Sequence, residues 1–329
     1  MKNNVDEARP DNVQVRVRNL VKHFVQRQGL FKRGSRVVRA VDGVSLDCRR
    51  MQTLGIVGES GCGKTTLARC MLRLIEPTAG EVYFEGVDIL ALPRRQLRGL
   101  RRNMQVVFQN PYSSLDPRMS VLRIVGEPLR THTSMNHAQV RERVAELLEQ
   151  VGMAGGHLYR YPHEFSGGQL QRIAIARALA LNPKFLVLDE PTAALDVSVQ
   201  AQIMTMLMEL QRNLELTYLY ISHNLTLIHH VSDAIAVLYL GRVVERASAE
   251  EIFDNPLHPY TEALLSSTPS LDPKLRQQRI ILGGGVPDPA NPPPGCAFRP
   301  RCPRGSDGCS EMVPELVDVG GEHLVACHL

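Results

Sequence analysis

A glycine-rich stretch, GESGCGKTT, has the residue types and the spacing that bind a phosphate group. It runs from Gly58 to Thr66 and matches the pattern G-x-x-x-x-G-K-[ST] between an expected strand and an expected helix. The glycines let backbone N–H groups point at a phosphate, and the N-terminus of the following helix adds a partial positive charge. Lys64 can neutralise β- and γ-phosphate oxygens, and the Thr65 hydroxyl can ligate Mg²⁺. The loop therefore predicts a nucleoside triphosphate bound with Mg²⁺.

Three further positions could act on the same phosphates. The run FLVLDE (185–190) is typical of a buried strand and ends in Asp189 and Glu190. A carboxylate there can hold the water shell of Mg²⁺, and the next one, Glu190, can orient and deprotonate an attacking water. His223 follows the strand-like run TYLYIS and could donate a hydrogen bond to a γ-phosphate. Taken alone, His223 and Gln109 would be read as ordinary structural residues.

The run FSGGQLQRIAIARAL contains a second anion-binding pattern. Ser166 to Gln169 leads directly into an expected helix, whose N-terminus would offer backbone N–H groups to an anion. This loop has no lysine of its own. The chain thus carries one complete and one incomplete phosphate site, and the sequence pattern alone does not say which phosphate the second one serves.

Strands and helices must alternate to position these residues. Alternation with period two at 13–20 predicts a half-buried strand, and continuous apolar runs predict buried parallel strands. Between residues 111 and 180 the pattern is helical, and Gly152 is expected to end the helix at 137–152. Strands on both sides of a helical insertion predict a parallel α/β sheet. The expected strands are 13–20, 43–48, 53–58, 104–109, 185–190, 217–223 and 234–241, and the expected helices are 64–74, 137–152 and 198–214.

The bulk composition is that of an ordinary globular protein. The chain has 329 residues, 43% of them hydrophobic and 22% charged, and a net charge of only +4. Such a small net positive charge does not suggest a nucleic-acid partner. We find no apolar run of the ~18 residues that would span a bilayer and no apolar leader segment at the N-terminus. We therefore expect a cytoplasmic protein that reaches a membrane only through a partner.

In order and spacing, the phosphate loop, Gln109, SGGQ, VLDEP, ALD and His223 resemble the ATPase domain of ABC transporters. The resemblance covers roughly residues 12–265. It implies an α/β fold with a P-loop NTPase core, in which a RecA-like parallel sheet is joined to an antiparallel β subdomain. It also implies an ABC α-helical subdomain at about 111–180. Residues 1–11 would form a flexible N-terminus, and 266–329 a C-terminal extension that ends in an irregular, cysteine-rich tail.

The resemblance assigns roles by position. Phe24, or His23 beside it, would stack on adenine, and Gln109 would sense Mg²⁺ and link to a membrane partner. The implied catalytic residues are Glu190, His223 and Gln109, the implied Mg²⁺ ligands are Thr65, Gln109 and Asp189, and the implied ATP contacts are Phe24, Gly58, Glu59, Ser60, Gly61, Cys62, Gly63, Lys64, Thr65, Thr66, Gln109 and Asp189.

The resemblance also gives the second loop a purpose, because ATPase domains of this family stack head to tail in pairs. The loop of Ser166, Gly167, Gly168 and Gln169 would contact ATP held by the partner, and Asp196 would lie in the loop that crosses to the other subunit. The implied partners are a second, homologous ATPase subunit in a favoured heterodimer, two permease subunits and, indirectly, a solute-binding protein. One departure is Phe165, where many relatives have leucine. It remains apolar, so little effect is expected.

A finer resemblance covers nearly the whole chain. EPTAALDVSVQAQI, NPLHPYTEALLSSTP and NPPPGCAFRPRC are similar to ATPase subunits of bacterial dipeptide and oligopeptide importers. This implies an ATP hydrolase coupled to peptide import, at the cytoplasmic face of the inner membrane. Nickel and glutathione importers share much of the pattern. An ABC ATPase acting on DNA or ribosomes is disfavoured because no long coiled-coil insertion splits the motifs. A GTPase or small-molecule kinase is disfavoured because N-K-x-D is missing and SGGQ would be unexplained.

Four of the seven cysteines fall in the last 34 residues, separated by gaps of five, six and seventeen residues. Zinc sites usually contain short C-x₂₋₄-C pairs, and none is present here. Incidental or buried thiols, structural zinc and a [4Fe–4S] cluster all remain open on spacing alone. The resemblance to peptide-importer tails favours the cluster. Its ligands would be Cys296, Cys302, Cys309 and Cys327.

Overall fold

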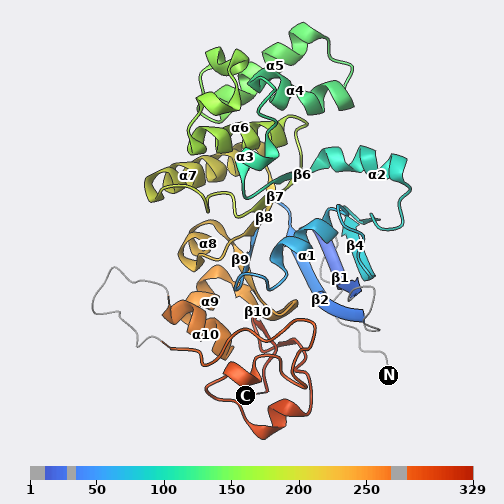
Figure 1. Cartoon of the computed structure of the whole chain (residues 1–329), viewed down its shortest axis with the longest axis vertical. Coiled ribbons are helices and arrows are strands. Elements are labelled where there is room, and N and C mark those ends of the chain that lie inside the picture. The colour runs from blue at the N-terminus through green and yellow to red at the C-terminus, as the bar shows by residue number, and fades with distance from the viewer. Residues whose placement is uncertain (1–11, 28–34, 268–279, 329) are drawn as a thin grey trace.

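The computed structural model describes residues 12–27, 35–267 and 280–328, so the expected flexible N-terminus at 1–11 lies outside the described residues. The strands form two sheets, and the helices pack around them (Figure 1). One is antiparallel, in the order β2-β1-β4-β5, and the other has eight strands in the order β11-β12-β10-β9-β3-β8-β7-β6. The strands are β1 (Val13–Arg27), β2 (Ser35–Arg49), β3 (Thr53–Val57), β4 (Ala79–Phe84), β5 (Val87–Asp88), β6 (Met104–Val107), β7 (Phe185–Asp189), β8 (Thr217–Ile221), β9 (Ala234–Tyr239), β10 (Arg242–Ser248), β11 (Val317–Asp318) and β12 (Leu324–Val325).

The middle of the larger sheet is parallel, as the continuous apolar runs predict. Strands β9, β3, β8, β7 and β6 pair in parallel, and every residue of β3, β7 and β8 is buried. Parallel strands leave a sheet by the same edge, which is where ligands bind in such folds. The carboxyl ends of β3, β8, β7 and β6 therefore lie side by side, and each leads into one of the motifs that the sequence singles out.

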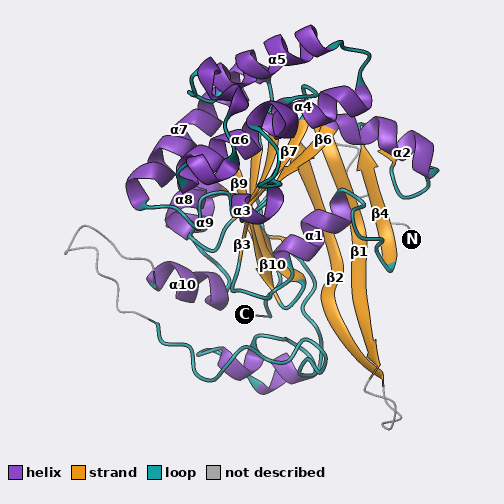
Figure 2. Cartoon of the chain, turned by 45° about the horizontal axis from the view of Figure 1, so that its top comes forward, coloured by secondary structure: helices purple, strands orange, loops and turns teal. Residues whose placement is uncertain are grey.

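Helices cover the parallel sheet and build a separate helical subdomain (Figure 2). Helices α3 to α6 are inserted between β6 and β7, which confirms the expected helical insertion. The helices are α1 (Lys64–Met71), α2 (Arg94–Leu100), α3 (Pro111–Ser114), α4 (Val121–His132), α5 (His137–Gln150), α6 (Gly167–Leu179), α7 (Val197–Leu214), α8 (Leu225–Val231), α9 (Ala249–Asp254) and α10 (Pro259–Ser266). No helix in the described part of the chain is both long and apolar enough to cross a membrane.

Alternate residues of the parallel strands enter two different cores, because successive side chains of a strand point to opposite faces. Phe185 and Val187 of β7 join the core that contains α1 and the antiparallel sheet. Leu186 and Leu188 join the core that contains the helical subdomain. The parallel sheet is thus covered on both faces, which explains why its strands read as uninterrupted apolar runs.

Several element boundaries differ from the sequence-based expectation: β2 already begins at Ser35, and β6 ends at Val107. Helix α1 stops at Met71 instead of continuing to about Leu74, because Arg73 adopts a left-handed conformation with φ of 48°. Strand β1 continues to Arg27 instead of ending at Leu20, with a register irregularity between Leu20 and Val21. Gly152 has φ of 70° two residues after α5 ends, as expected for a glycine that terminates a helix.

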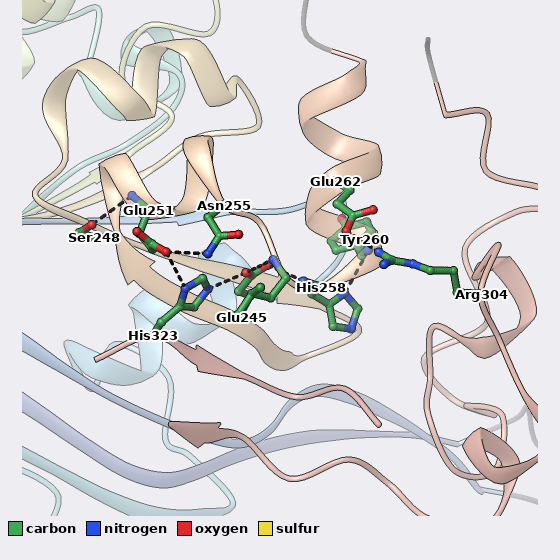
Figure 3. A network of polar contacts seen from close by, with 10 residues as sticks. Glu245, Ser248, Glu251, Asn255, His258, Tyr260, Glu262, Arg304 and His323 are labelled. Atoms are coloured by element: carbon green, nitrogen blue, oxygen red, sulfur yellow. Dashed lines mark hydrogen bonds and ion pairs between the residues drawn. The ribbon is translucent and has the colours of Figure 1, made fainter. Parts of the chain in front are cut away.

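The cysteine-rich tail was expected to be irregular, and the structure gives it short elements. It contains the 3₁₀ helices Arg299–Arg301 and Asp307–Ser310 and the hairpin of β11 and β12. Strand β12 pairs with β10 and so extends the larger sheet. The side chain of His323 points to Glu245 of β10, with 2.8 Å between Nε2 and Oε1 (Figure 3). The tail is therefore bonded to the body of the molecule by a strand and a buried polar contact.

Candidate functional site

The phosphate loop, residues 58–63, connects β3 to α1 in a conformation that depends on glycine. Gly58 and Gly63 have φ values of 153° and 107°. A Cβ atom on Gly58 would lie 2.2 Å from the Leu238 carbonyl oxygen, and one on Gly63 would lie 2.0 Å from the Ala40 carbonyl oxygen. Any larger residue would therefore displace the backbone. The loop leads directly into the N-terminus of α1, which favours an anion.

Lys64 is the first residue of α1, and its side chain folds back over the phosphate loop. The buried Nζ atom donates hydrogen bonds to the carbonyl oxygens of Gly58, at 2.7 Å, and Glu59, at 3.0 Å. The ammonium group thus lies at the centre of the loop. A phosphate bound there would replace these two carbonyl partners.

Asp189, the last residue of β7, meets Thr65 on the first turn of α1. The Thr65 hydroxyl donates to Asp189 Oδ1 at 3.0 Å, and the carboxyl group is buried. Burial raises the pKa of Asp189, repulsion from Glu190 raises it further, and the Thr65 hydrogen bond opposes both effects. A hydroxyl and a carboxylate side by side beside the phosphate loop are oxygen ligands of the kind that Mg²⁺ prefers.

Glu190 brings together the three residues expected to act in catalysis. Gln109, two residues after β6, donates from Nε2 to Glu190 Oε2 at 2.8 Å. His223, two residues after β8, places Nδ1 3.2 Å from Glu190 Oε1. Glu190 itself has φ of 47°, and its N–H donates to the Ile221 carbonyl oxygen. The three side chains converge because β6, β7 and β8 are neighbours in the sheet.

The second anion-type loop lies on the helical subdomain and caps α6. The Ser166 side chain accepts a hydrogen bond from the Gln169 N–H, and the Gln169 side chain accepts one from the Ser166 N–H. This capping box fixes the start of the helix. Helix α6 packs on α3, α4, α5 and α7, whereas α1 packs on β1, β2, β7 and β8 (Figure 1). The two loops therefore belong to different parts of the molecule.

Of three further expected residues, Phe24 and Asp196 are exposed and His23 is half-buried. Phe24 is exposed on β1, with the Lys22 ammonium 4.9 Å from its ring centroid. His23 is engaged elsewhere, because its Nε2 atom lies 3.1 Å from Asp42 Oδ1. Asp196 precedes α7, and its side chain makes no capping hydrogen bond to that helix. Phe24 and Asp196 are accordingly open to a ligand or a partner.

Two residues beside the phosphate loop were not expected from the sequence. The Glu59 N–H donates to the Tyr260 hydroxyl at 2.9 Å, and the Glu59 carboxylate receives two hydrogen bonds from Arg301. Tyr260 belongs to α10 and Arg301 to the C-terminal extension. Both lie in runs that resemble peptide-importer sequences, but no spacing or period in those runs indicates contact with a loop more than two hundred residues earlier.

Two of the four late cysteines, Cys296 and Cys302, are influenced by the other two. The Cys296 N–H donates to the Cys309 carbonyl oxygen at 2.8 Å. Burial raises the pKa values of Cys296 and Cys302, and both are raised further by Cys309 and Cys327. Within residues 12–27, 35–267 and 280–328, however, no group of three or more Cys, His, Asp or Glu side chains has the arrangement of a metal site. The expectation of a cluster is thus not supported by this arrangement.

Comparison with known proteins agrees with this geometry. The family model for ABC transporters matches residues 41–193, and that for the oligopeptide/dipeptide transporter C-terminal region matches 244–309. The oligopeptide transport ATP-binding protein AppF of Bacillus subtilis (strain 168) is 50% identical over 316 residues, which cover 95% of this chain and 96% of AppF. The dipeptide transport ATP-binding protein DppF of Escherichia coli (strain K12) is 49% identical over 309 residues, which cover 94% of this chain and 92% of DppF.

Solved structures resemble the ATPase part of the chain. A dimeric post-hydrolysis structure of the ATP-binding cassette MJ0796, bound to ADP and Pi, has a TM-score of 0.64 and 30% identity and covers 71% of this chain and 98% of that one. The structure of cbiO1 from Clostridium perfringens, part of the ABC transporter complex cbiONQ, has a TM-score of 0.64 and 28% identity, with coverage of 74% and 92%.

The fold and the site together define an ATPase of the ATP-binding-cassette class. Sequence identity near 50% to peptide transport ATP-binding proteins, over almost the whole length of the chain, narrows the class of protein further. The chain belongs to the family of ABC transporter ATP-binding proteins that carry the oligopeptide/dipeptide transporter C-terminal region.

Proposed function

We propose that this chain is the ATP-hydrolysing subunit of a bacterial ABC importer for dipeptides or oligopeptides. The observation that carries the proposal is the meeting of the phosphate loop with Asp189 and the Gln109–Glu190–His223 group at adjacent strand ends. The cargo class is supported by the printed names of relatives that match over nearly the whole chain. The alternatives are the same module on a nickel or glutathione importer, and an ABC ATPase acting on DNA or ribosomes.

In this proposal the phosphate loop and α1 bind the triphosphate. Lys64 releases its two carbonyl partners and donates to β- and γ-phosphate oxygens. Thr65, Asp189 and Gln109 would hold Mg²⁺, which would supply positive charge that neutralises the phosphate oxygens. Phe24 stacks on adenine, because His23 is already bonded to Asp42. The remaining contacts come from the loop itself and Thr66: Gly58, Glu59, Ser60, Gly61, Cys62 and Gly63.

Hydrolysis follows from the Glu190 group. The Glu190 carboxylate orients a water and accepts its proton as the water oxygen bonds to the γ-phosphorus. The bond from the γ-phosphorus to the β–γ bridging oxygen breaks, and ADP leaves with that oxygen. Gln109 and His223 fix the orientation of the carboxylate through contacts of 2.8 Å and 3.2 Å. His223 is more than half exposed in the single chain and can donate to the γ-phosphate once ATP is bound.

The second phosphate-type loop serves a partner subunit in this proposal. The N-termini of α6 and α7 are exposed, at Ser166, Gln169, Asp196 and Val197. They are therefore free to contact an anion or a neighbouring chain. A homologous ATPase subunit would place its own ATP on the loop of Ser166, Gly167, Gly168 and Gln169, and a heterodimer is the form that we favour. The pair would dock on two permease subunits at the cytoplasmic face of the inner membrane, and closure around ATP would move the permease.

The experiment is reconstitution of the full chain with its partner ATPase and permeases in lipid vesicles. We expect uptake of a labelled dipeptide that requires ATP and a peptide-loaded solute-binding protein. Uptake of nickel or glutathione in place of peptide would assign the alternative cargo. Purification without any permease, together with stimulation of hydrolysis by DNA or ribosomes, would reject the transport function.

A [4Fe–4S] cluster on Cys296, Cys302, Cys309 and Cys327 is a separate part of the proposal. It is supported by the 2.8 Å hydrogen bond from the Cys296 N–H to the Cys309 carbonyl oxygen and by the effect of Cys309 and Cys327 in raising the pKa values of Cys296 and Cys302. Cluster binding would require the tail to close further around the four sulfur atoms. Protein purified without oxygen should contain iron and should show a broad absorbance band at about 400 nm. Stoichiometric zinc without iron would favour a structural zinc site instead, and the absence of both metals would reject the proposal.

A further inference from the structure

We propose that Arg301, in the C-terminal extension, is a positioning residue for ATP, because its guanidinium holds and neutralises the Glu59 carboxylate inside the phosphate loop. The two residues are 242 positions apart in the chain. The proposal rests on ATP binding at this loop, which the Lys64→Ala variant tests separately.

The contact between the two side chains is two-pronged and largely shielded from water. Arg301 Nη1 donates to Glu59 Oε2 at 2.7 Å, and Nη2 donates to Oε1 at 2.9 Å. The Arg301 side chain is 7% exposed and the Glu59 side chain 29% exposed. The guanidinium also lies 5.9 Å from the centroid of the Tyr239 ring. A bidentate pair in such a place has a fixed geometry and is screened less than a surface pair.

Glu59 is held at its backbone as well as at its side chain. Its N–H donates to the Tyr260 hydroxyl, and its carbonyl oxygen accepts from Lys64 Nζ. Among the hydrogen bonds of the described residues, Arg301 alone donates to the Glu59 carboxylate. The extension therefore controls both the direction and the charge balance of this side chain.

The contact between Arg301 and Glu59 matters because of the charge on the Glu59 carboxylate. ATP carries several negative charges into the loop, and a free carboxylate in the same loop would repel them. The Lys64 ammonium lies beside the Glu59 backbone, 3.0 Å from its carbonyl oxygen. Once Lys64 turns to the phosphates, Arg301 is the cation that still balances Glu59. Its effect should therefore fall on nucleotide binding rather than on the chemical step.

The extension is attached firmly enough to act as a brace for the loop. Phe298, three residues before Arg301, is 1% exposed and packs edge-on against Tyr239 with 5.3 Å between ring centroids. On the other side, Asp288 accepts two hydrogen bonds from Arg36 of β2. The position of Arg301 is thus set by the body of the molecule.

The test uses the full chain and its affinity for MgATP, measured by titration calorimetry. Arg301→Gln should weaken binding by about tenfold, the scale of one lost charge-assisted contact. Arg301→Lys keeps the charge and should bind MgATP to within about threefold of the natural chain, because it loses only the two-pronged geometry. In the reconstituted transporter, Arg301→Gln should raise KM for ATP by a similar factor and change kcat by less than about twofold.

A second pair of variants separates neutralisation of the Glu59 carboxylate from a purely structural role of Arg301. In a Glu59→Gln background, which has no carboxylate to neutralise, Arg301→Gln should change MgATP affinity by less than about twofold. The matched control is Arg304→Ala, in the same segment, which breaks an exposed ion pair with Glu262 of α10. It should leave MgATP affinity unchanged. The thermal unfolding midpoint of each nucleotide-free variant identifies any folding defect.

Two results would overturn the proposal. One is Arg301→Gln binding MgATP as tightly as the natural chain while Lys64→Ala fails to bind. The other is a loss of affinity that persists undiminished in the Glu59→Gln background, which would make Arg301 a structural residue only. Normal binding by Lys64→Ala would instead reject the nucleotide site itself.

Discussion

Glu190 occupies its position at a cost in backbone energy. Its φ of 47° is a left-handed conformation, which costs a glutamate on the order of 1–3 kcal/mol. The cost is offset by the hydrogen bond from its N–H to Ile221 and by its contacts with Gln109 and His223. An unfavourable backbone held by side chains from two neighbouring strands is typical of a residue whose direction matters for chemistry.

Replacing Glu190 with glutamine should separate ATP binding from hydrolysis. Glu190→Gln keeps the shape and the Gln109 contact but removes the base, so turnover should fall by about 10²–10⁴-fold while MgATP still binds. The ATP-bound pair should then stay closed, which gel filtration can detect. Glu215→Gln is a matched control, because Glu215 is also left-handed, with φ of 53°, and lies away from the site after α7. Undiminished hydrolysis by Glu190→Gln would refute the base assignment.

In the proposed function, the N-terminus of α6 is the element outside the sheet edge that contacts ATP. Ser166 begins α6 with a capping box and yet remains exposed, and Gly168 lies so close to Val199 that a Cβ there would meet its Cγ1 at 2.5 Å. The start of α6 is therefore packed against α7. A rigid, exposed helix N-terminus without a lysine fits a loop that completes another chain's site.

Ser166→Arg should disable the partner's ATP site and spare the site on this chain. The bulky cation would fill the space where the partner's phosphate lies. In the assembled pair, photoaffinity labelling by an ATP analogue should persist on this chain, while hydrolysis at the partner's phosphate loop is lost. Ser166→Ala is the control for loss of the side-chain cap, at about 1 kcal/mol of stability, because it adds neither bulk nor charge. Loss of labelling on this chain by Ser166→Arg would contradict the arrangement in trans.

Helix α10 depends on a neutral histidine. His258 Nδ1 accepts a hydrogen bond from the Tyr260 N–H at 3.0 Å, and the ring is buried. Burial, with a smaller contribution from nearby Arg304, lowers the pKa of His258 to about 4. In the unfolded chain, His258 takes up a proton as the pH falls below its ordinary pKa of 6.5. In the folded chain, it does so only near pH 4. The contribution to stability is therefore complete above pH 6.5 and is lost as the pH falls to 4.

His258→Asn should remove this pH dependence and retain a capping side chain. The natural chain should lose roughly 3 kcal/mol more unfolding free energy than the variant between pH 7 and pH 4. Chemical denaturation of both proteins across that range measures the difference. Above pH 7 the gap between the two proteins should stay constant. A gap that does not change with pH anywhere would show that His258 is not buried in its neutral form.

At the scale of the whole molecule, the C-terminal extension is continuous with the ATPase body. Strand β12 pairs with β10, and Phe298 joins the core of the helical subdomain. The Glu245 side chain is fully buried, and its carboxylate accepts from the N–H groups of Leu257 and His258 as well as meeting His323 (Figure 3). One buried carboxylate thus links β10, the start of α10 and the terminal hairpin, so the extension should unfold together with the body.

His323→Ala should lower the stability of the entire chain rather than release the hairpin alone. It leaves part of a buried carboxylate unpaired, at about 1–3 kcal/mol. Calorimetry should show one transition at a lower temperature. Glu322→Gln, the adjacent residue, breaks only the exposed ion pair with Arg49 and should cost less than about 0.5 kcal/mol. A separate early transition in His323→Ala would show that the extension is an independent unit.

Local sequence determined the ATP site and the kind of fold that carries it. Asp189 ends a buried strand, the phosphate loop and Glu190 each follow one directly, and His223 and Gln109 each lie two residues after a strand. Parallel strands share one exit edge, so short motifs at strand ends meet without any information about distant contacts. The glycine spacing, the apolar runs and the helical period indicate the phosphate loop, the Asp189–Glu190 pair and the α/β sheet, whereas Gln109 and His223 gain their expected roles only through the resemblance to ABC ATPases.

The role of the extension was decided only by tertiary structure. Arg301 and Glu59 are 242 residues apart, and His323 and Glu245 are 78 apart. No period or short motif connects such residues. The two short strands of the tail have too few residues to show alternation, and β12 exists as a strand because β10 presents an edge to it. Pairing and packing across the folded chain, not local preference, therefore place the tail against the phosphate loop.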